Sequence, residues 1–256
     1  MWRKYRKFLF LKRMNILLRK ALKFWYLLMV GLIFICTYPF VYYFSRKPSR
    51  YPTLNFFRKV CAFFPSAMSG IYYKFNYEQP IDWSKQYIVC PNHASNLDIF
   101  TMSLLMRNNF FFLGKEDLLK NPVTRVFFKT IDIPINRDSK MSSYRAFKQT
   151  SERITLGMSP VIFPEGKIGD EYPPLLHDFK SGPFRLAIEH KISILPVSIK
   201  DNWKVCWDNG GKFGLKPGIS NIYIHRPIEV TSFSLADEDR LRELVYEKIK
   251  SKLDYN

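Results

Sequence analysis

The chain has 256 residues, of which 47% are apolar and 24% are charged, and its formal net charge is +18. These values argue against a disordered chain or a collagen-like repeat, and the length is sufficient for one or two domains with a buried core. None of the four cysteines forms a Cys-x-x-Cys pair, which argues against a disulfide framework, a zinc finger or a redox dithiol and favours a reducing cytosolic environment.

The positive charge is concentrated at the N-terminus. Residues 1–50 contain 12 of the 40 basic residues and none of the 22 acidic residues. Basic side chains are interspersed there with tryptophan, phenylalanine and leucine, a pattern that predicts an amphipathic helix on an anionic phospholipid membrane. A disordered arm that binds nucleic acid is the alternative, but the apolar content of the arm disfavours it.

Residues 24–44 are predicted to form a membrane helix. These 21 residues carry no charge, and a helix of that length, at about 1.5 Å per residue, spans the roughly 30 Å hydrocarbon core of a bilayer. Aromatic residues lie at both ends, where they favour the level of the lipid headgroups. A cleaved signal peptide would have a shorter apolar core and a small-residue cleavage site, and the sequence has neither feature.

A second uncharged stretch covers residues 60–73 and is interrupted by Pro65 and Gly70. It suits a re-entrant or interfacial segment, and a core helix of the following domain is an equally good interpretation. We predict that the two stretches form a hairpin or lie partly in the inner leaflet, so that the N-terminus and the following domain are both in the cytosol. The basic residues after residue 44 would then stay near anionic headgroups: Arg46, Lys47, Arg50, Arg58 and Lys59. The expected domains are a membrane-anchoring part at 1–75 and a second part at 76–256.

Short strands and longer helices alternate in the second part. Strands are predicted at residues 86–90, 110–113, 131–135, 160–163, 192–199 and 222–224. Helices are predicted at residues 95–106, 121–128, 142–156, 183–189 and 236–253. Because the first connections between strands are too long for hairpins, the pattern indicates an α/β domain with a mixed, largely parallel sheet flanked by helices. No glycine-rich nucleotide-binding motif follows a strand.

His93 and Asp98 follow the first of these strands in the segment PNHASNLD. Residues five apart do not share a face of a regular helix, but they meet where a strand turns into a helix. With Ser95 as the helix N-cap, the Asp98 carboxylate reaches back to one ring nitrogen of His93 and leaves the other nitrogen as a general base. The alternative is that Ser95 and Asp98 only cap the helix while His93 packs.

Four segments of the second part carry polar or turn-forming residues in a defined order. They are Asn-His-x-x-x-x-Asp ending at Asp98, IDIPINR ending at Arg137, Phe-Pro-Glu-Gly at 163–166, and a strand that contains Pro196. In this order the chain resembles the glycerolipid acyltransferase family, which includes the 1-acylglycerol-3-phosphate acyltransferases. The resemblance covers residues 86–200, and the ordered match to all four segments makes it specific.

The resemblance implies a site at one end of the sheet. His93 and Asp98 are the implied catalytic pair, and the implied substrate-binding residues are Lys115, Arg137, Glu165, Gly166, Lys167 and Lys180. The cations among them are expected to bind a phosphate group. The third segment departs from the family, because Lys167-Ile168-Gly169 replaces the usual Thr-Arg-Ser. Lys167 can supply a charge there, but not the bidentate geometry of an arginine.

The implied reaction is direct acyl transfer from acyl-CoA or acyl carrier protein to the free hydroxyl of 1-acylglycerol-3-phosphate, which gives phosphatidic acid. His93 would act as general base and Asp98 would orient it. We expect no metal and no resident cofactor, since the other histidines lack metal-ligand spacing. The catalytic domain is expected on the cytosolic face of the cytoplasmic membrane. Another lysolipid acceptor, or a non-catalytic basic protein that binds membranes or nucleic acid, remains the alternative.

Overall fold

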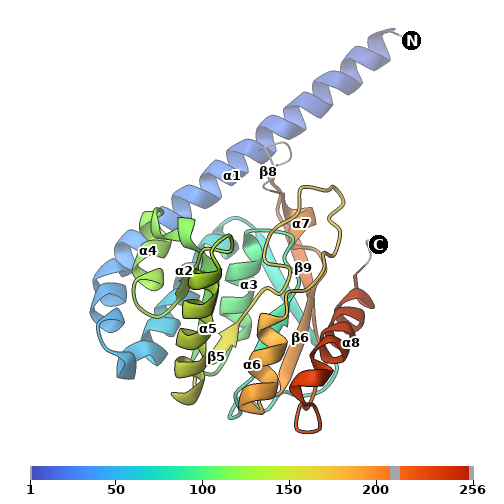
Figure 1. Ribbon diagram of the computed structural model, residues 1–256. Coiled ribbons are helices and arrows are strands. Elements are labelled where there is room, and N and C mark those ends of the chain that lie inside the picture. Colours follow the sequence, from blue (N-terminus) through green and yellow to red (C-terminus); the bar gives the residue numbers. More distant parts are fainter. Residues whose placement is uncertain (1, 208–213, 254–256) are drawn as a thin grey trace.

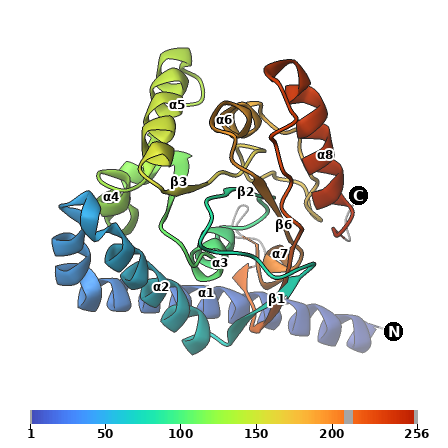
Figure 2. The same cartoon turned by 90° about the horizontal axis from the view of Figure 1, so that it is seen from below.

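The computed structural model describes residues 2–207 and 214–253, with side chains from Ile16 onward. The basic side chains before Ile16, for which the sequence predicts lipid binding, lie outside this described part. The described residues form a seven-stranded sheet with helices on both faces (Figures 1 and 2).

The sheet has the strand order β1-β9-β6-β2-β5-β3-β4. Neighbouring strands are parallel except for β6 and β9, which are antiparallel. The mixed, largely parallel sheet expected from the sequence is therefore confirmed, and the five strands from β6 to β4 all end at the same edge. The strands are β1 (Ile71–Tyr77), β2 (Ile88–Pro91), β3 (Phe110–Lys115), β4 (Ile133–Ile135), β5 (Ser159–Val161), β6 (Ile194–Ile199) and β9 (Gly218–Ile224). A separate small sheet joins β7 (Cys206–Trp207) to β8 (Gly214–Leu215).

Helices cover both faces of the sheet because its central strands are apolar on both sides. In β2, Ile88 and Cys90 pack in the core with α6 and α8, whereas Val89 packs in the core with α3. In Figure 2, α5, α6 and α8 lie on one side of the sheet, and α3 lies on the other with α1 and α2 outside it. The helices are α1 (Trp2–Ser45), α2 (Tyr51–Met68), α3 (Leu97–Leu105), α4 (Pro122–Phe128), α5 (Lys140–Thr155), α6 (Gly182–His190), α7 (Asn202–Val205) and α8 (Glu238–Lys250).

Residues 60–73 do not form the single membrane segment that was one expectation. Their first part belongs to α2, which continues through Pro65 to Met68, and Ile71 begins β1. Gly70 makes the turn between them with a φ of +69°, and a Cβ there would lie 3.0 Å from the Cβ of Pro217. The range is therefore divided between a helix and a strand. The core-helix interpretation accounts for the buried side chains of 60–68, and the interfacial interpretation stays a prediction for the side chains exposed there. The expected domain division after residue 75 lies inside β1.

One helix, α1, takes the place of the expected amphipathic arm and the separate membrane helix. Among the described residues, Ile16–Ser45 within α1 is the one helical stretch with the length and hydropathy of a membrane span. The short 3-10 helix η1 (Pro48–Arg50) then reverses the chain. α2 packs back against α1, and the rings of Phe40 and Phe57 stack with their centroids 5.0 Å apart. The two helices therefore form the expected hairpin.

Arg58 ties α2 to the sheet. Its Nη2 donates to Asp132 Oδ2 at 2.8 Å, and the backbone N–H of Phe112 donates to Asp132 Oδ1 at 2.9 Å. The guanidinium also lies 4.5 Å from the ring centroid of Phe127 and 5.3 Å from that of Phe110. Both charges are buried. The expectation that the basic residues after residue 44 all lie near headgroups is therefore wrong for Arg58, because a buried carboxylate pairs with it.

Replacing Arg58 should destabilise the fold strongly. Arg58→Met leaves the Asp132 charge buried and unpaired, which costs about 3–5 kcal/mol. We expect a clear fall in the thermal unfolding midpoint of the protein in detergent, while Lys47→Met, at an exposed basic residue of the same hairpin, should leave it unchanged. The double change Arg58→Met with Asp132→Asn should recover part of the loss. An unfolding midpoint of Arg58→Met equal to that of the wild type would contradict the role given to this pair.

Candidate active site

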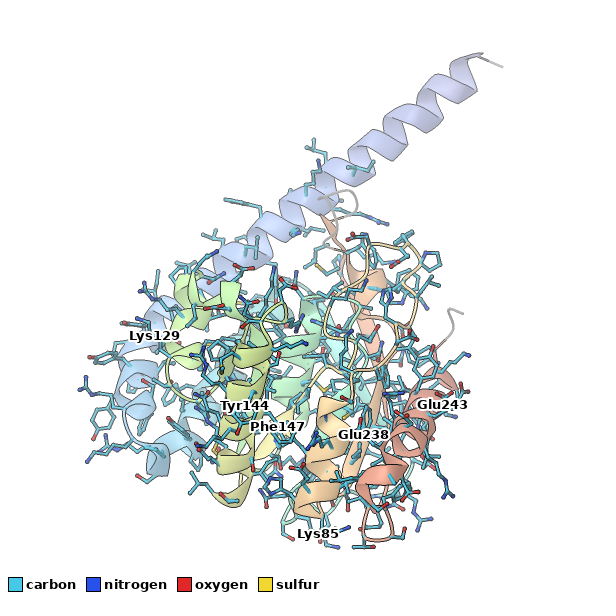
Figure 3. The ribbon with its side chains drawn as sticks, viewed as in Figure 1. Lys85, Lys129, Tyr144, Phe147, Glu238 and Glu243 are labelled. Carbon is cyan, nitrogen blue, oxygen red and sulfur yellow. The ribbon has the colours of Figure 1, made fainter. Side chains whose placement is uncertain are left out.

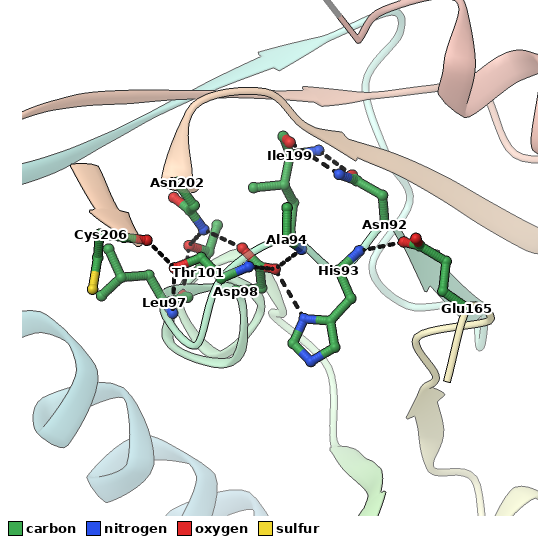
Figure 4. Close-up of polar contacts among 11 residues, drawn as sticks. Asn92, His93, Ala94, Leu97, Asp98, Thr101, Glu165, Ile199, Asn202 and Cys206 are labelled. Carbon is green, nitrogen blue, oxygen red and sulfur yellow. Dashed lines mark hydrogen bonds and ion pairs between the residues drawn. The ribbon is translucent and has the colours of Figure 1, made fainter. Parts of the chain in front are cut away.

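The loop between β2 and α3, residues 92–96, places His93 against Asp98. His93 Nδ1 lies 2.9 Å from Asp98 Oδ2, and the same oxygen accepts the backbone N–H groups of Ala94 at 2.8 Å and Ser95 at 2.9 Å. Asn202 Nδ2 donates to the other oxygen, Oδ1, at 2.7 Å (Figure 4). Asp98 is fully buried and faces four nitrogen donors, an environment that suits an ionised carboxylate.

The helix start differs from the one expected. α3 begins at Leu97 with Asn96 as its N-cap residue, so Ser95 is not the N-cap. The Ser95 hydroxyl nevertheless accepts the backbone N–H of Leu97 at 3.3 Å, a capping contact, and it donates to the carbonyl of Cys206 at 2.8 Å. Asp98 takes over part of the capping role, because its carboxylate accepts the two backbone N–H groups that precede the helix. Capping and orientation of His93, which the sequence presents as alternatives, are thus performed by the same carboxylate.

The neighbours of the His93 ring set its tautomer and its orientation. Because Asp98 Oδ2 is an acceptor surrounded by N–H donors, His93 Nδ1 carries the proton in this contact, and Nε2 is left with its lone pair. The ring stacks on Phe163, with centroids 4.0 Å apart and an interplanar angle of 23°. This arrangement provides a general base whose orientation is set from one side by a carboxylate and from another by an aromatic ring.

Glu165 supports the loop from the neighbouring strand. Its Oε1 accepts the backbone N–H of His93 at 2.6 Å, and its Oε2 accepts the backbone N–H of His177 at 2.9 Å. Burial raises the pKa of Glu165 to about 8, although these two hydrogen bonds act in the opposite direction. Both oxygens are thus engaged with the protein backbone, and the side chain connects the His93 loop to the loop after β5.

A cavity of about 420 Å³ lies beside the His93 loop and is lined by residues of β3, β4, the loop after β5, α5 and α6. Phe163, which stacks on His93, is part of its wall, and so is Phe147 of α5, labelled in Figure 3. Arg137, Gly166 and Lys180 also line it, so the structure brings three of the predicted substrate-binding residues together. Most of the remaining wall is apolar: Leu113, Ile135, Ala146, Ile162, Pro164, Pro183 and Leu186.

Gly166 lies beside Arg137 and has a backbone conformation that favours glycine. It has a φ of +76°, and a Cβ built on it would lie 3.7 Å from Arg137 Nε. The guanidinium therefore lies directly over the backbone of the Phe-Pro-Glu-Gly segment. A largely apolar cavity with two cations in its wall suits an amphiphile that carries a phosphate group.

The structure does not bring two of the predicted lysines into the wall of this cavity. Lys115, at the end of β3, is exposed and pairs with Asp117, with Nζ and Oδ2 2.7 Å apart. Lys167 is exposed beside Gly166 but is not among the described residues that line the cavity. Lys167 is nevertheless close enough to Glu165 for its charge to lower the pKa of that carboxyl.

The sequence analysis missed two asparagines of this site. Asn92 Nδ2 donates to the carbonyl of Ile199 at 3.1 Å and its Oδ1 accepts the N–H of Ile199 at 2.6 Å, which fastens the His93 loop to β6. Asn202 holds Asp98. Asn92 is part of the first family segment and could have been noticed there. Asn202 lies 104 residues from Asp98 and carries no local signal.

A second group of polar side chains around a histidine lies elsewhere in the fold and is buried away from solvent. His225 Nε2 lies 2.8 Å from Ser198 Oγ, and its Nδ1 lies 3.7 Å from Glu78 Oε2, which resembles a nucleophilic triad. However, Ser198 and His225 are buried, and Ser198 donates its proton to the carbonyl of Ile249 at 2.8 Å. Burial lowers the pKa of His225 to about 4. No substrate reaches this hydroxyl, so the group is structural.

Comparisons with known proteins agree with this geometry. The sequence profile of the family described as Acyltransferase matches residues 73–200. The chain is 28% identical over 138 residues to a chloroplastic 1-acyl-sn-glycerol-3-phosphate acyltransferase, LPAT1, of Arabidopsis thaliana, a match that covers 54% of this chain and 38% of that protein. It is 27% identical over 177 residues to the 1-acyl-sn-glycerol-3-phosphate acyltransferase of Borreliella burgdorferi, which covers 65% of this chain and 66% of the relative.

A solved structure has the same fold. The crystal structure of the 1-acyl-sn-glycerophosphate acyltransferase PlsC from Thermotoga maritima superposes with a TM-score of 0.72 at 22% identity, over 94% of this chain and 95% of that one. The chain spans 38% of the length of the first of these curated relatives and 66% of the length of the second. The family match covers half of the chain and contains the His93 loop, Arg137 and Glu165. The chain belongs to the acyltransferase family, of the 1-acylglycerol-3-phosphate acyltransferase type.

Proposed function

We propose that this protein transfers a fatty acyl group from a thioester to the free hydroxyl of 1-acylglycerol-3-phosphate and so makes phosphatidic acid. The observation that carries the proposal is the pair of His93 and Asp98, 2.9 Å apart, beside an apolar cavity with Arg137 and Lys180 in its wall. The chemistry needs one base, one cationic site and room for acyl chains. The geometry supplies each of them.

The reaction proceeds by direct attack of the acceptor hydroxyl on the thioester carbonyl. His93 Nε2 takes the hydroxyl proton as the new C–O bond forms, and Asp98 stabilises the resulting imidazolium. The C–S bond then breaks, and the same proton goes to the sulfur that leaves. The products are the ester and the free thiol of coenzyme A or acyl carrier protein. This sequence needs no resident cofactor, since the donor is itself a substrate.

In this proposal the acceptor phosphate binds to the cations in the cavity wall. Arg137 and Lys180 line the cavity, and exposed Lys167 follows Gly166 in the loop beside it. The fork of Arg137 suits two phosphate oxygens, while the lysines add point charges. Lys167-Ile168 stands where the family has an arginine, so this chain lacks one bidentate ligand for the acceptor headgroup.

The hairpin of α1 and α2 docks the enzyme on an anionic membrane. From Arg19 to Val41 α1 lies along the domain: Gly214 meets the backbone of Arg19, the rings of Tyr26 and Phe100 are 5.9 Å apart, and Val41 is buried. If α1 crossed the bilayer, these parts of the domain would enter hydrocarbon. We therefore place α1 within one leaflet, inserted by large apolar side chains exposed on both helices: Leu17, Leu18, Phe24, Leu27, Leu28, Leu32, Ile35, Phe40, Phe56, Phe63, Phe64 and Met68.

Product analysis tests the reaction and the acceptor together. Purified protein in mixed micelles is supplied with acyl-CoA, or acyl carrier protein charged with the same chain, and with a panel of lysolipids that differ only in headgroup. Mass spectrometry should detect phosphatidic acid from 1-acylglycerol-3-phosphate as the main product. A different diacyl lipid as the main product would assign the same chemistry to another acceptor. No acylated lipid from any acceptor would reject the enzyme and favour a protein that only binds membranes or nucleic acid.

Removal of the base should abolish most of the turnover. His93→Ala should remain folded and bound to membranes but lose acyl transfer by at least about 100-fold, the low end for a lost general base. Asp98→Asn should also impair turnover, because an amide supports the wrong tautomer and does not stabilise the imidazolium. The matched control is His190→Ala, a histidine that bonds Ser151 away from the cavity. Near-normal turnover of His93→Ala would exclude this assignment.

The cavity cations should act on the acceptor. Arg137→Ala should raise KM for 1-acylglycerol-3-phosphate by about 10- to 100-fold, the effect of losing hydrogen bonds between charged groups, with a smaller rise for Lys180→Ala and Lys167→Ala. KM for the acyl donor should stay nearly constant. Lys148→Ala, at an exposed lysine of α5, is the control. A rise in KM for the donor alone would assign these cations to the phosphates of the donor carrier.

The catalytic domain should lie on the cytosolic side. Acyl-CoA and acyl carrier protein are cytosolic, and a hairpin within one leaflet keeps both its ends on that side. A fluorescent protein fused after Asn256 should therefore be bright in bacterial cells, and an alkaline phosphatase fused at the same point should be inactive. The reverse pair of signals, an active phosphatase and a dark fluorescent fusion, would place the domain outside.

A further inference from the structure

Asn202 is the feature of the site that neither the sequence nor the family segments account for. It begins α7, just after β6, and it is fully buried. Its Nδ2 donates to Asp98 Oδ1 at 2.7 Å and to Thr101 Oγ1 at 2.8 Å, so both amide hydrogens are used (Figure 4). Thr101 in turn donates to the carbonyl of Leu97 at 2.9 Å. These bonds determine which way the amide points, with its nitrogen toward the carboxylate.

The hydrogen bond from Asn202 to Asp98 differs from the other three hydrogen bonds that Asp98 accepts. His93 and the backbone of Ala94 and Ser95 all donate to Oδ2, and each belongs to the loop whose shape is in question. Asn202 donates to Oδ1 from a different strand end. The three contacts to Oδ2 already restrain rotation about the Cβ–Cγ bond, and the bond to Oδ1 adds a restraint that does not come from the loop. The direction in which Asp98 faces His93 therefore depends in part on a residue outside the loop.

The segment that carries Asn202 contacts the loop a second time. The carbonyl of Cys206, at the end of α7, accepts the Ser95 hydroxyl at 2.8 Å. Asn202 and Cys206 thus hold the start of α3 from the side of β6, while Glu165 holds the N–H of His93 from the side of β5.

We infer that Asn202 is a positioning residue for catalysis: by donating to Oδ1 it holds Asp98 in the orientation that presents His93 Nε2 to the acceptor hydroxyl. The inference rests on the proposed function of His93 as general base. It predicts an effect on the rate of acyl transfer and on its pH dependence, with little effect on substrate binding, because Asn202 is not among the described residues that line the cavity.

Asn55 is a matched control elsewhere in the fold. It is also a buried asparagine, and its Nδ2 also donates twice, to Asn109 Oδ1 and to the carbonyl of Phe110, each at 2.9 Å. Both asparagines leave Oδ1 without a hydrogen-bond partner among the described residues. Asn55 belongs to α2 and contacts the start of β3, at the end of the sheet opposite to His93. The same substitution removes two hydrogen bonds at either position, but only the substitution at 202 removes a bond to Asp98.

The first experiment compares Asn202→Ala with Asn55→Ala in full-length protein in detergent, with thermal unfolding measured alongside. Asn202→Ala should lower kcat by about 10- to 100-fold with KM for donor and acceptor nearly unchanged, while Asn55→Ala should lose stability and keep kcat per folded molecule. Equal kcat in the two variants, or a loss that matches the unfolded fraction, would give Asn202 a structural role only.

The second experiment uses Asn202→Asp to make the contact depend on pH. The titratable groups near Asp98 are His93 of the loop, Tyr73 of β1, Cys206 of β7 and Glu165 after β5. Asp201 and Lys204, the titratable neighbours of position 202 along the chain, pair with each other at 2.8 Å. The new carboxyl can donate to Asp98 Oδ1 only while the two acids share a proton, and their repulsion breaks the contact once both are ionised.

Wild-type activity should rise with pH, as expected for a reaction that uses a general base. Asn202→Asp should follow that rise and then fall at higher pH, which gives a bell-shaped profile of kcat; Asn55→Asp should keep the wild-type shape. A profile of Asn202→Asp that parallels the wild type would overturn the inference. His93→Ala in the same assay separates the two claims, because an active His93→Ala defeats the proposed function, whereas an inactive His93→Ala with a normal Asn202→Ala defeats the inference alone.

Discussion

The site depends on one buried carboxylate. Asp98 accepts four hydrogen bonds, from His93, Ala94, Ser95 and Asn202, and each donor belongs to a segment that would otherwise leave its polar group unpaired or its orientation free. Oδ2 of Asp98 accepts the backbone N–H groups of Ala94 and Ser95 and also contacts the His93 ring. The stability of the loop and the orientation of the base therefore have a common physical cause. A change that weakens one is expected to weaken the other.

The topology explains why distant residues meet at Asp98. β2 pairs in parallel with β5 on one side and with β6 on the other. The loops that follow these strands therefore emerge at one edge of the sheet and carry His93, Glu165 and Asn202 respectively. The same direction of β4 brings Arg137 to that edge. Open α/β sheets bind ligands at the carboxyl ends of their strands for this reason.

The sequence was sufficient for the parts that depend on local patterns. The alternation of strands and helices predicted the sheet, and the spacing of His93 and Asp98 predicted a contact that the structure places at 2.9 Å. It failed where a residue's role depends on a partner far along the chain. Arg58 looked like a membrane-facing cation because Asp132, its buried partner, is 74 residues away. Asn202 gave no signal at all, and β1 was missed because its pairing partner β9 lies at the other end of the chain.

The protonation of the His93 ring tests the central claim most directly. Protein labelled with ¹⁵N on histidine, in detergent micelles, gives ring nitrogen signals that distinguish the two neutral tautomers, and a His93→Gln sample identifies the signals of His93 among those of the four histidines. If Asp98 holds the ring as described, neutral His93 carries its proton on Nδ1 and has a bare Nε2. A neutral His93 with the proton on Nε2 would contradict the account, because that nitrogen could not accept the proton of the acceptor hydroxyl.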